Sequence, residues 1–460
     1  MDTKLPHAWL PALLNDVSEI VTGKTPSTKN PHNFGGGVPF IKPADLDKGQ
    51  YITQTVETLT DLGATSVPTV PANSIPVTCI GNLGKVGITK QISATNQQIN
   101  TVVPSSLVDY RFFYYQLKTL KPWMQENASA TTVTIINKAK FSKAPVLLPP
   151  FAEQKVIVDK LDTLLAQVET TQARLERIPQ ILKRFRQSVL AAAVSGKLME
   201  DFQAFKSNSF TESYLPNRWQ SFQLSELSDF ITSGSRGWAK YYSDSGSLFI
   251  RSQDINTDEL ELNSPCFVTP PENKEGKRTK VQKNDLLLTI TGANVTKCAR
   301  VKVDLSDAYV SQHVGLIRLS DASMAPFIEL ILKAPNSGRY QLQKAAYGGG
   351  KPGLNLQNIK DVHWALPEPS EAEAIVRRVN ELFAHADHIE QQVNNALARV
   401  NNLTQSILAK AFHGELTEQW RKDNPELISG ENSAEALLER IKAERAAKAP
   451  VKRTRKKATA

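Results

Sequence analysis

A long heptad repeat constrains this chain more than any other feature of its sequence. Within Pro149–Leu198, apolar residues recur at intervals that alternate between four and three, and Thr171 takes the one missing place; they are Ile157, Leu161, Leu164, Val168, Leu175, Ile178, Leu182, Phe185 and Val189. A spacing of ~3.5 residues keeps one apolar seam of a helix facing a partner helix. The segment therefore predicts a helix of about 60 Å, which needs a second helix to bury its seam.

The chain supplies that second helix. Pro149–Leu198 aligns without a gap on Pro367–Leu416, and about a quarter of the aligned residues are identical. The seam is retained, at Ile375, Val379, Leu382, Ala386, Ile389, Val393, Ala396, Val400, Leu403 and Ile407. Both copies end in a glycine, Gly196 and Gly414, where a helix C-cap favours the left-handed conformation. We expect both segments to form long helices.

The regions before the two helices also repeat, more loosely. Trp9 precedes LNDVSEIVTG, and Trp219 precedes LSELSDFITSG. Likewise VPFIKPADL at 38–46 is echoed by LFIRSQDI at 248–255, and NQQINTVVP at 96–104 by SQHVGLIRL at 311–319. The chain is therefore two copies of one unit, a globular domain followed by a long helix. Because a copy of the globular domain precedes each helix, a simple dimerisation coiled coil is the weaker interpretation.

The repeat sets the predicted domains. Residues 1–150 and 204–368 are globular, the spacers at 151–203 and 369–424 are helical, and 425–460 is a basic tail. Short β-branched runs broken by Gly, Pro and Asn predict small strands in both globular parts, with helices at Tyr110–Lys118 and Pro326–Leu332. The predicted fold class is α+β. In the tail we expect a helix around Ala434–Arg445 and disorder beyond Pro450.

Composition limits the location and the partners. At 460 residues the chain is too long for one core, and its net charge of +9 favours a polyanionic partner. It has no apolar run long enough to span a membrane and no export signal. The three cysteines, Cys79, Cys266 and Cys298, are scattered, which is typical of reduced thiols in the cytoplasm. We expect a cytoplasmic protein.

Catalytic motifs are incomplete throughout the sequence. GKT at 23–25 resembles the end of a phosphate-binding loop, but Ser18 stands where that loop needs its first glycine, and Pro26 follows. LPPF at 148–151 is similar to an amino-methyltransferase tetrad, but its leucine cannot supply the polar acceptor for the target amine. The histidines have no metal-ligand spacing. We expect no catalytic or metal site in this chain.

Gly-rich loops that carry Lys, Arg, Asn or Gln recur in both copies. Exposed amides and lysines suit phosphate contacts, and Asn, Gln and Arg read base edges. For any single loop, a flexible surface turn is the simpler interpretation; the recurrence is what favours DNA. The candidate DNA-binding residues are Lys24, Lys42, Asn82, Lys85, Gln97, Gln98, Arg236, Lys240, Arg251, Asn294, Lys297, Gln312, His313, Lys351 and Asn355.

Four segments carry a resemblance to a known family. They are LPPFAEQ (148–154), its second copy LPEPSEAEAIV (366–376), QSVLAAAVSGKL (187–198) and QSILAKAFHGEL (405–416). With the two Trp-anchored domain starts, the chain resembles the DNA-specificity subunit of type I restriction–modification enzymes over roughly residues 5–420. Two departures stand out. The second copy reads PEPSEAE where the first reads PPFAEQK, which alters the turn before the helix. Pro179 should kink the first helix.

The resemblance implies two target-recognition domains separated by two antiparallel coiled-coil helices. Each domain would read one half of a bipartite, asymmetric DNA site. The subunit itself would be non-catalytic and hold no cofactor. Two methyltransferase subunits would bring S-adenosylmethionine, and restriction (helicase–nuclease) subunits would bring ATP and Mg²⁺. No membrane is involved.

Two other classes of function stay open at the level of sequence. A coiled-coil scaffold without a DNA function would lack exposed Lys, Asn and Gln in its loops and would not bind DNA. A stand-alone enzyme would need a cofactor or metal site that the sequence does not show.

Overall fold

A computed structural model describes residues 5–130, 133–198, 219–234, 237–270, 274–348, 350 and 352–448. The chain divides into two compact units, Met1–Arg174 with Leu397–Ala460, and Leu175–Ala396. Each unit holds one globular domain together with part of each long helix. The first domain comprises the described residues up to 150, and the second comprises those from 219 to 368.

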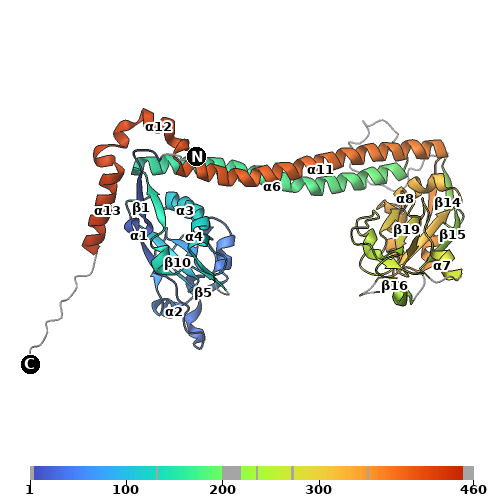
Figure 1. Ribbon diagram of the computed structural model, residues 1–460, viewed down its shortest axis with the longest axis horizontal. Helices are drawn as coiled ribbons and strands as arrows, with labels where there is room; N and C mark the ends of the chain where they lie inside the picture. The colour runs from blue at the N-terminus through green and yellow to red at the C-terminus, as the bar shows by residue number, and fades with distance from the viewer. Residues whose placement is uncertain are drawn as a thin grey trace, which may run out of the picture. The chain divides into compact units, whose positions relative to one another are not determined.

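The two predicted long helices are present (Figure 1). They are α6 (Phe151–Val194) and α11 (Pro369–Phe412), each of 44 residues. Helix α6 continues through Pro179. Gly196 and Gly414 follow the helix ends with φ of 75° and 77°, as their C-cap position predicts.

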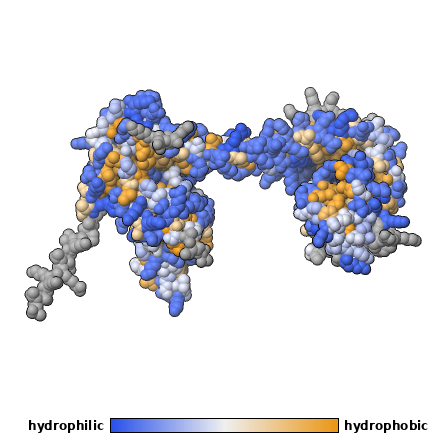
Figure 2. Space-filling view, viewed as in Figure 1, coloured by the Kyte–Doolittle hydropathy of each residue, from blue (hydrophilic) through white to orange (hydrophobic). Residues whose placement is uncertain are grey.

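The helices pack against each other by opposite ends. In the first unit, Ile157 and Leu161 near the start of α6 share a buried cluster with Leu408 near the end of α11. In the second unit, Val189 near the end of α6 shares a cluster with Ile375 near the start of α11. The arrangement within each unit is therefore antiparallel. The outer surface of the helices is mainly hydrophilic (Figure 2).

About half of the apolar seam residues are buried, and most of the others are half-buried. Two seam residues of α11, Ile389 and Leu403, are 42% and 47% exposed. A two-helix pair offers only one partner face, so seam residues at its edge stay in contact with solvent.

The first domain contains small sheets of short strands. The main sheet of this domain has the strand order β2-β10-β7, and its neighbouring strands are antiparallel. A second sheet has the order β5-β3-β9-β6, in which β3 and β9 are parallel. The strands are β1 (Leu10–Leu13), β2 (Ser18–Thr22), β3 (Phe34–Ile41), β4 (Tyr51–Ile52), β5 (Glu57–Leu59), β6 (Thr69–Val70), β7 (Ile75–Thr78), β8 (Ile88–Thr89), β9 (Ser93–Thr95), β10 (Ile99–Pro104), β11 (Ser129–Ala130), β12 (Thr134–Ile135) and β13 (Pro145–Leu148).

The second domain repeats this plan. Its main sheet has the order β15-β22-β19-β20, and its second sheet, β16-β18-β17-β21, again contains a parallel pair, β17 and β21. The strands are β14 (Gln220–Gln223), β15 (Ser228–Ser233), β16 (Tyr242–Ser243), β17 (Ser247–Ile250), β18 (Phe267–Val268), β19 (Leu286–Thr289), β20 (Cys298–Arg300), β21 (Ala308–Val310), β22 (Val314–Leu319) and β23 (His363–Leu366). The duplication thus extends to strand topology.

The remaining helices are much shorter than α6 and α11. They are α1 (Leu14–Val17), α2 (Asp61–Thr65), α3 (Tyr110–Thr119), α4 (Lys121–Asn127), α5 (Lys138–Phe141), α7 (Lys274–Thr279), α8 (Ala325–Lys333), α9 (Gly338–Ala345), α10 (Leu356–Lys360), α12 (Glu418–Asp423) and α13 (Ala434–Lys448). Helices α3, α8 and α13 are those predicted from the sequence. The α3 aromatics Phe112, Phe113, Tyr114 and Tyr115 are buried.

Candidate nucleic-acid interface

Three polar loops of the first domain leave the β2-β10-β7 sheet at the same edge. The register places Thr22, the last residue of β2, opposite Asn100. It also places Thr78, the last residue of β7, opposite Ile99, the first residue of β10. The loops that start after residues 22 and 78 and the loop that ends at 98 therefore converge.

The second domain repeats the convergence. Ser233 at the end of β15 lies opposite Gly315, and Thr289 at the end of β19 lies opposite Val314. A further loop joins them, because the Leu354 amide donates to the Ile290 carbonyl at 2.8 Å. Most of the candidate residues lie on these converging loops, so the duplication places similar polar loops at equivalent edges of two separate domains.

A glycine holds the first loop close in each copy. A Cβ on Gly23 would lie 2.2 Å from the Asn96 carbonyl oxygen, and one on Gly234 would lie 2.1 Å from that of Val310. No side chain fits at such distances. The glycine of GKT therefore allows two backbone segments to pack closely. A phosphate-binding loop would be followed by a helix, and no helix follows this glycine, which agrees with the interpretation of GKT as a chance match.

Lys24 and the two glutamines form the exposed part of the first-domain edge. Lys24 is exposed, and its amide donates to the Thr95 carbonyl at 2.9 Å. The Thr25 hydroxyl donates to Gln97 Oε1 at 2.6 Å, and Gln98 accepts from Asn96 at 2.9 Å. A cation thus stands beside oriented amides, which suits a phosphate contact next to a base edge. Thr25 was missing from the sequence prediction; only its position between Lys24 and a proline could have suggested it.

Two other first-domain candidates have acidic partners within the domain. Lys42 forms an ion pair with Glu57. Lys85 forms one with Asp47 at 2.5 Å. Asn82, on the same loop as Lys85, is exposed, and its carbonyl accepts from Thr78. A lysine that keeps its acidic partner offers less charge to phosphate than Lys24 does.

Ion pairs also hold the candidates of one second-domain loop. Arg251 bonds the Asp254 carboxylate at 3.0 Å and the Ser264 carbonyl at 2.8 Å. Lys297 lies 3.1 Å from Asp258, and the Asn294 amide donates to the Ser252 carbonyl at 3.4 Å. These bonds order the loop from 251 to 258 against the loop from 294 to 297.

The charge on Asp258 is stabilised by its neighbours. Burial acts to raise the pKa of this carboxyl, but the bonds from Arg339 and the nearby Lys297 outweigh it. The pKa therefore lies below its ordinary value of 3.8. Asp258 is ionised at neutral pH and acts as an anchor for cations of the domain.

The remaining candidates are more loosely held. Gln312 lies 3.2 Å from His313, which is exposed, and Lys240 is exposed above the Tyr241 ring. Asn355 caps α10 by accepting from the Asn358 amide at 2.8 Å. Arg236 and Lys351 lie outside the described residues. The exposed candidates Lys24, Asn82, Gln97, Lys240 and His313 present their polar atoms most freely. A direct role of any of them in DNA binding stays a prediction.

A buried polar network in the first unit was not foreseen from the sequence. Glu153, fully buried at the start of α6, accepts from the Trp9 indole at 2.8 Å and the Thr417 hydroxyl at 2.6 Å. Arg421 of α12 donates to the same carboxylate at 2.6 Å. The only sequence signal was that Glu153 recurs as Glu371 in the second copy. The network ties the domain start, α6 and the C-terminal segment together.

Within the described part of the chain, no group of His, Cys, Asp or Glu could hold a metal ion, and no helix is long and apolar enough to cross a membrane. The described cysteines are free thiols. Burial raises the pKa of Cys79 to about 11 and that of Cys298 to about 12. These two thiols are therefore protonated and unreactive at neutral pH.

Comparison with known proteins identifies the duplicated unit. The model of the type I restriction modification DNA specificity domain matches twice, at residues 6–180 and 216–399. The chain belongs to this family. It is 39% identical over 458 residues to the type I restriction enzyme EcoBI specificity subunit of Escherichia coli, covering 98% of this chain and 95% of that one. It is 35% identical over 482 residues to the EcoKI specificity subunit of Escherichia coli strain K12, covering 99% of both.

Solved structures of the type I family share the fold. A chain from a study of complex assembly and conformational transition of the type I R-M system superposes with a TM-score of 0.67 at 16% identity, covering 89% of this chain and 98% of that one. The HsdS subunit from Thermoanaerobacter tengcongensis gives a TM-score of 0.58 at 17% identity, with the same coverage. The predicted fold, two α+β recognition domains and two long antiparallel helices arising by internal duplication, is confirmed.

Proposed function

We propose that this chain is the non-catalytic DNA-specificity subunit of a type I restriction–modification system and that its two domains read the two halves of a bipartite DNA site. The observation that carries the proposal is the repeated sheet edge. Each domain gathers polar loops at the same end of the same sheet, and each is followed by its own long helix. Recognition of a DNA site in two parts requires two recognition domains.

The loops supply both kinds of contact that DNA recognition needs, to phosphates and to base edges. Exposed cations such as Lys24 and Lys240 provide contacts to phosphate, which give affinity without sequence preference. Amides such as those of Gln97 and Gln312 provide hydrogen bonds to base edges. The loops of the two domains differ in sequence, so the two half-sites should differ and the whole site should be asymmetric.

Catalysis in this proposal belongs to partner subunits. Two methyltransferase subunits carry S-adenosylmethionine, and restriction subunits use ATP and Mg²⁺; the specificity subunit directs both to the site. The long helices offer a docking surface, since Ile181 and Ile389 in the second unit are 60% and 42% exposed. A cytoplasmic location, where the DNA is, follows from this role.

The test is labelled methyl transfer to DNA. The purified chain alone should transfer no label from S-adenosylmethionine. Addition of the methyltransferase subunit encoded beside it should give methylation at a split sequence. Label incorporated by the chain alone, or no stimulation of the partner, would contradict the proposal.

A further inference from the structure

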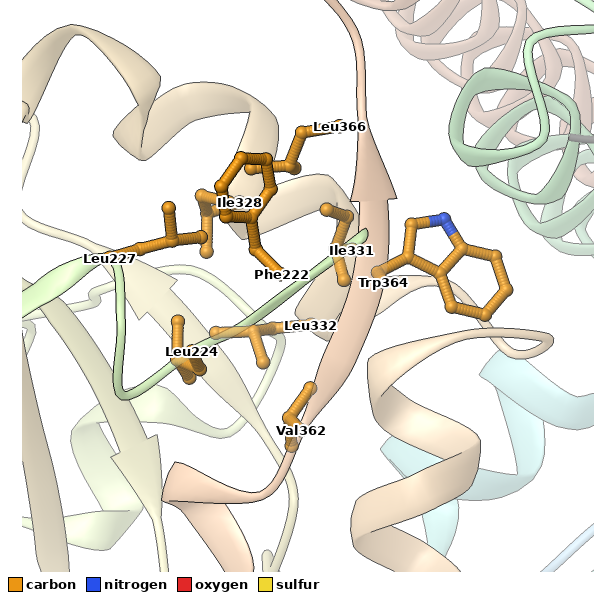
Figure 3. A pocket seen from close by; sticks show the side chains of 9 residues that line it. All are labelled: Phe222, Leu224, Leu227, Ile328, Ile331, Leu332, Val362, Trp364 and Leu366. Atoms are coloured by element: carbon orange, nitrogen blue, oxygen red, sulfur yellow. The ribbon is translucent and has the colours of Figure 1, made fainter. Parts of the chain in front are cut away.

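An apolar groove lies on the second domain between the two-stranded sheet of β14 and β23 and helix α8 (Figure 3). Three of its residues, Phe222, Leu227 and Trp364, are half-buried. The full lining is Phe222, Leu224, Leu227, Ile328, Ile331, Leu332, Val362, Trp364 and Leu366. An apolar groove rimmed by polar surface is typical of a binding site for an apolar partner face.

The first domain contains the same local structure. The Ser18 hydroxyl donates to the Leu14 carbonyl at 2.5 Å, and the Ser228 hydroxyl donates to the Leu224 carbonyl at 2.7 Å. Helix α1 of the first domain therefore corresponds to the turn at residues 224–227, and Val17, the last residue of α1, corresponds to Leu227.

In the first domain, this face is covered by α13. Helix α13 packs on α1 (Figure 1), and Leu437 and Ile441 share one buried cluster with Leu14 and Val17. Val17 is consequently 0% exposed, whereas its counterpart Leu227 is half-buried. Among the described residues, no helix covers the second-domain face in this way. The chain itself thus shows which kind of element this face accepts.

The groove rim indicates the charge of its occupant. Near the end of α13, Glu444 accepts from the hydroxyls of Ser105 and Ser106 at 2.9 and 3.0 Å. The second domain has Asp321 in place of Ser106, and bonds from Ser323 lower the pKa of this carboxyl. A glutamate here would meet a like charge, so a second copy of α13 is disfavoured and a basic residue is favoured.

We propose that this groove binds an amphipathic helix of the methyltransferase subunit, as α13 covers the first domain. The helix carries apolar residues spaced as Ala434, Leu437 and Ile441 are in α13, and a Lys or Arg where α13 has Glu444. The identity of the partner rests on the proposed function; the chemistry of the groove does not.

The first experiment tests the groove chemistry alone. The probe is a fluorescent peptide of residues 430–448 with Glu444→Lys and Glu439→Lys, held helical by a lactam that joins the Glu435 carboxyl to the amine introduced at position 439; both positions are exposed. It should bind the full chain, and Leu227→Lys should weaken binding at least tenfold. Val303→Lys, at a residue of the same domain that is 61% exposed, is the matched control and should change nothing.

The peptide with the native Glu444 should bind severalfold more weakly. No binding to the unaltered chain, or equal binding by the Leu227→Lys and Val303→Lys variants, would overturn the proposal. Circular dichroism checks folding. If Leu227→Lys does not fold, Phe222→Ser, at a second half-buried position, takes its place.

The second experiment identifies the occupant in the assembled complex. A photo-crosslinking amino acid at position 227 of the full chain, purified with its methyltransferase subunit, should crosslink to a helix of that subunit with the stated spacing. Crosslinks only to residues 199–218 or to a second copy of the chain would overturn the partner assignment. If no complex forms, the proposed function fails instead, and the peptide experiment still decides the groove chemistry.

Discussion

Removal of the Glu153 carboxylate should loosen the first unit at three points at once. The side chain of Glu153 is 0% exposed and that of its partner Arg421 is 13% exposed. The carboxylate also accepts from Trp9 and Thr417. Loss of one member of a buried ion pair costs about 3–5 kcal/mol, because the other charge stays buried without a partner. Glu153→Ala should therefore lower the local free energy of unfolding by about that amount.

Hydrogen–deuterium exchange measures the effect where it arises. Peptides that cover residues 8–14 and 417–423 should exchange faster by roughly two to three and a half orders of magnitude, since about 1.4 kcal/mol is tenfold. Glu153→Gln keeps the shape and the acceptor but loses the charge, so it should cost about 1.5–3 kcal/mol. The control is Glu418→Gln, which breaks an exposed ion pair with Lys422 and should leave exchange unchanged. If Glu153→Ala behaved like this control, the network would not hold the segments together.

Three further predictions concern DNA binding, pH and spacing. Lys24→Ala should weaken DNA binding and lower the slope of log K against log salt by ~1, which a titration at several salt concentrations measures; an unchanged slope would place Lys24 away from phosphate. The lowered pKa of Asp258 means that its stabilising charge is present at neutral pH and is lost as the pH falls below its ordinary value of 3.8. Asp258→Asn should thus destabilise the second domain at pH 7 and reduce the loss of stability in acid, as urea unfolding across pH would show; a variant as acid-sensitive as the parent would refute this. One heptad added to both α6 and α11 should lengthen each by ~10 Å and change the unread gap but neither half-site, as methylome sequencing would reveal; an unchanged gap would show that the helices do not set it.

The sequence predicted the elements that depend on local pattern. The long helices follow from a heptad repeat that occurs twice, and their ends follow from Gly196 and Gly414, whose φ is positive as expected. Helices α3, α8 and α13 were predicted because apolar residues recur with a helical period within one segment. The α+β class followed from short β-branched runs between turns.

Contacts between residues that are far apart in the chain could not be predicted from the sequence. The parallel pairing of β3 with β9 joins Phe40 to Ala94, and periodicity carries no information on such pairings. The same holds for the ion pair of Lys85 with Asp47, which turns a predicted phosphate contact into a residue with an internal partner. The Glu153 network needs Trp9 and the C-terminal segment in one place, which only the folded unit provides.

The most direct test of the central claim is a domain exchange followed by methylome sequencing. Residues 204–368 would be replaced by the equivalent domain of a relative that recognises another site, and the chain would be expressed with its partner subunits. The account predicts that one half of the methylated site changes and the other half stays the same. A change in both halves, or in neither, would contradict the claim that each domain reads its own half-site.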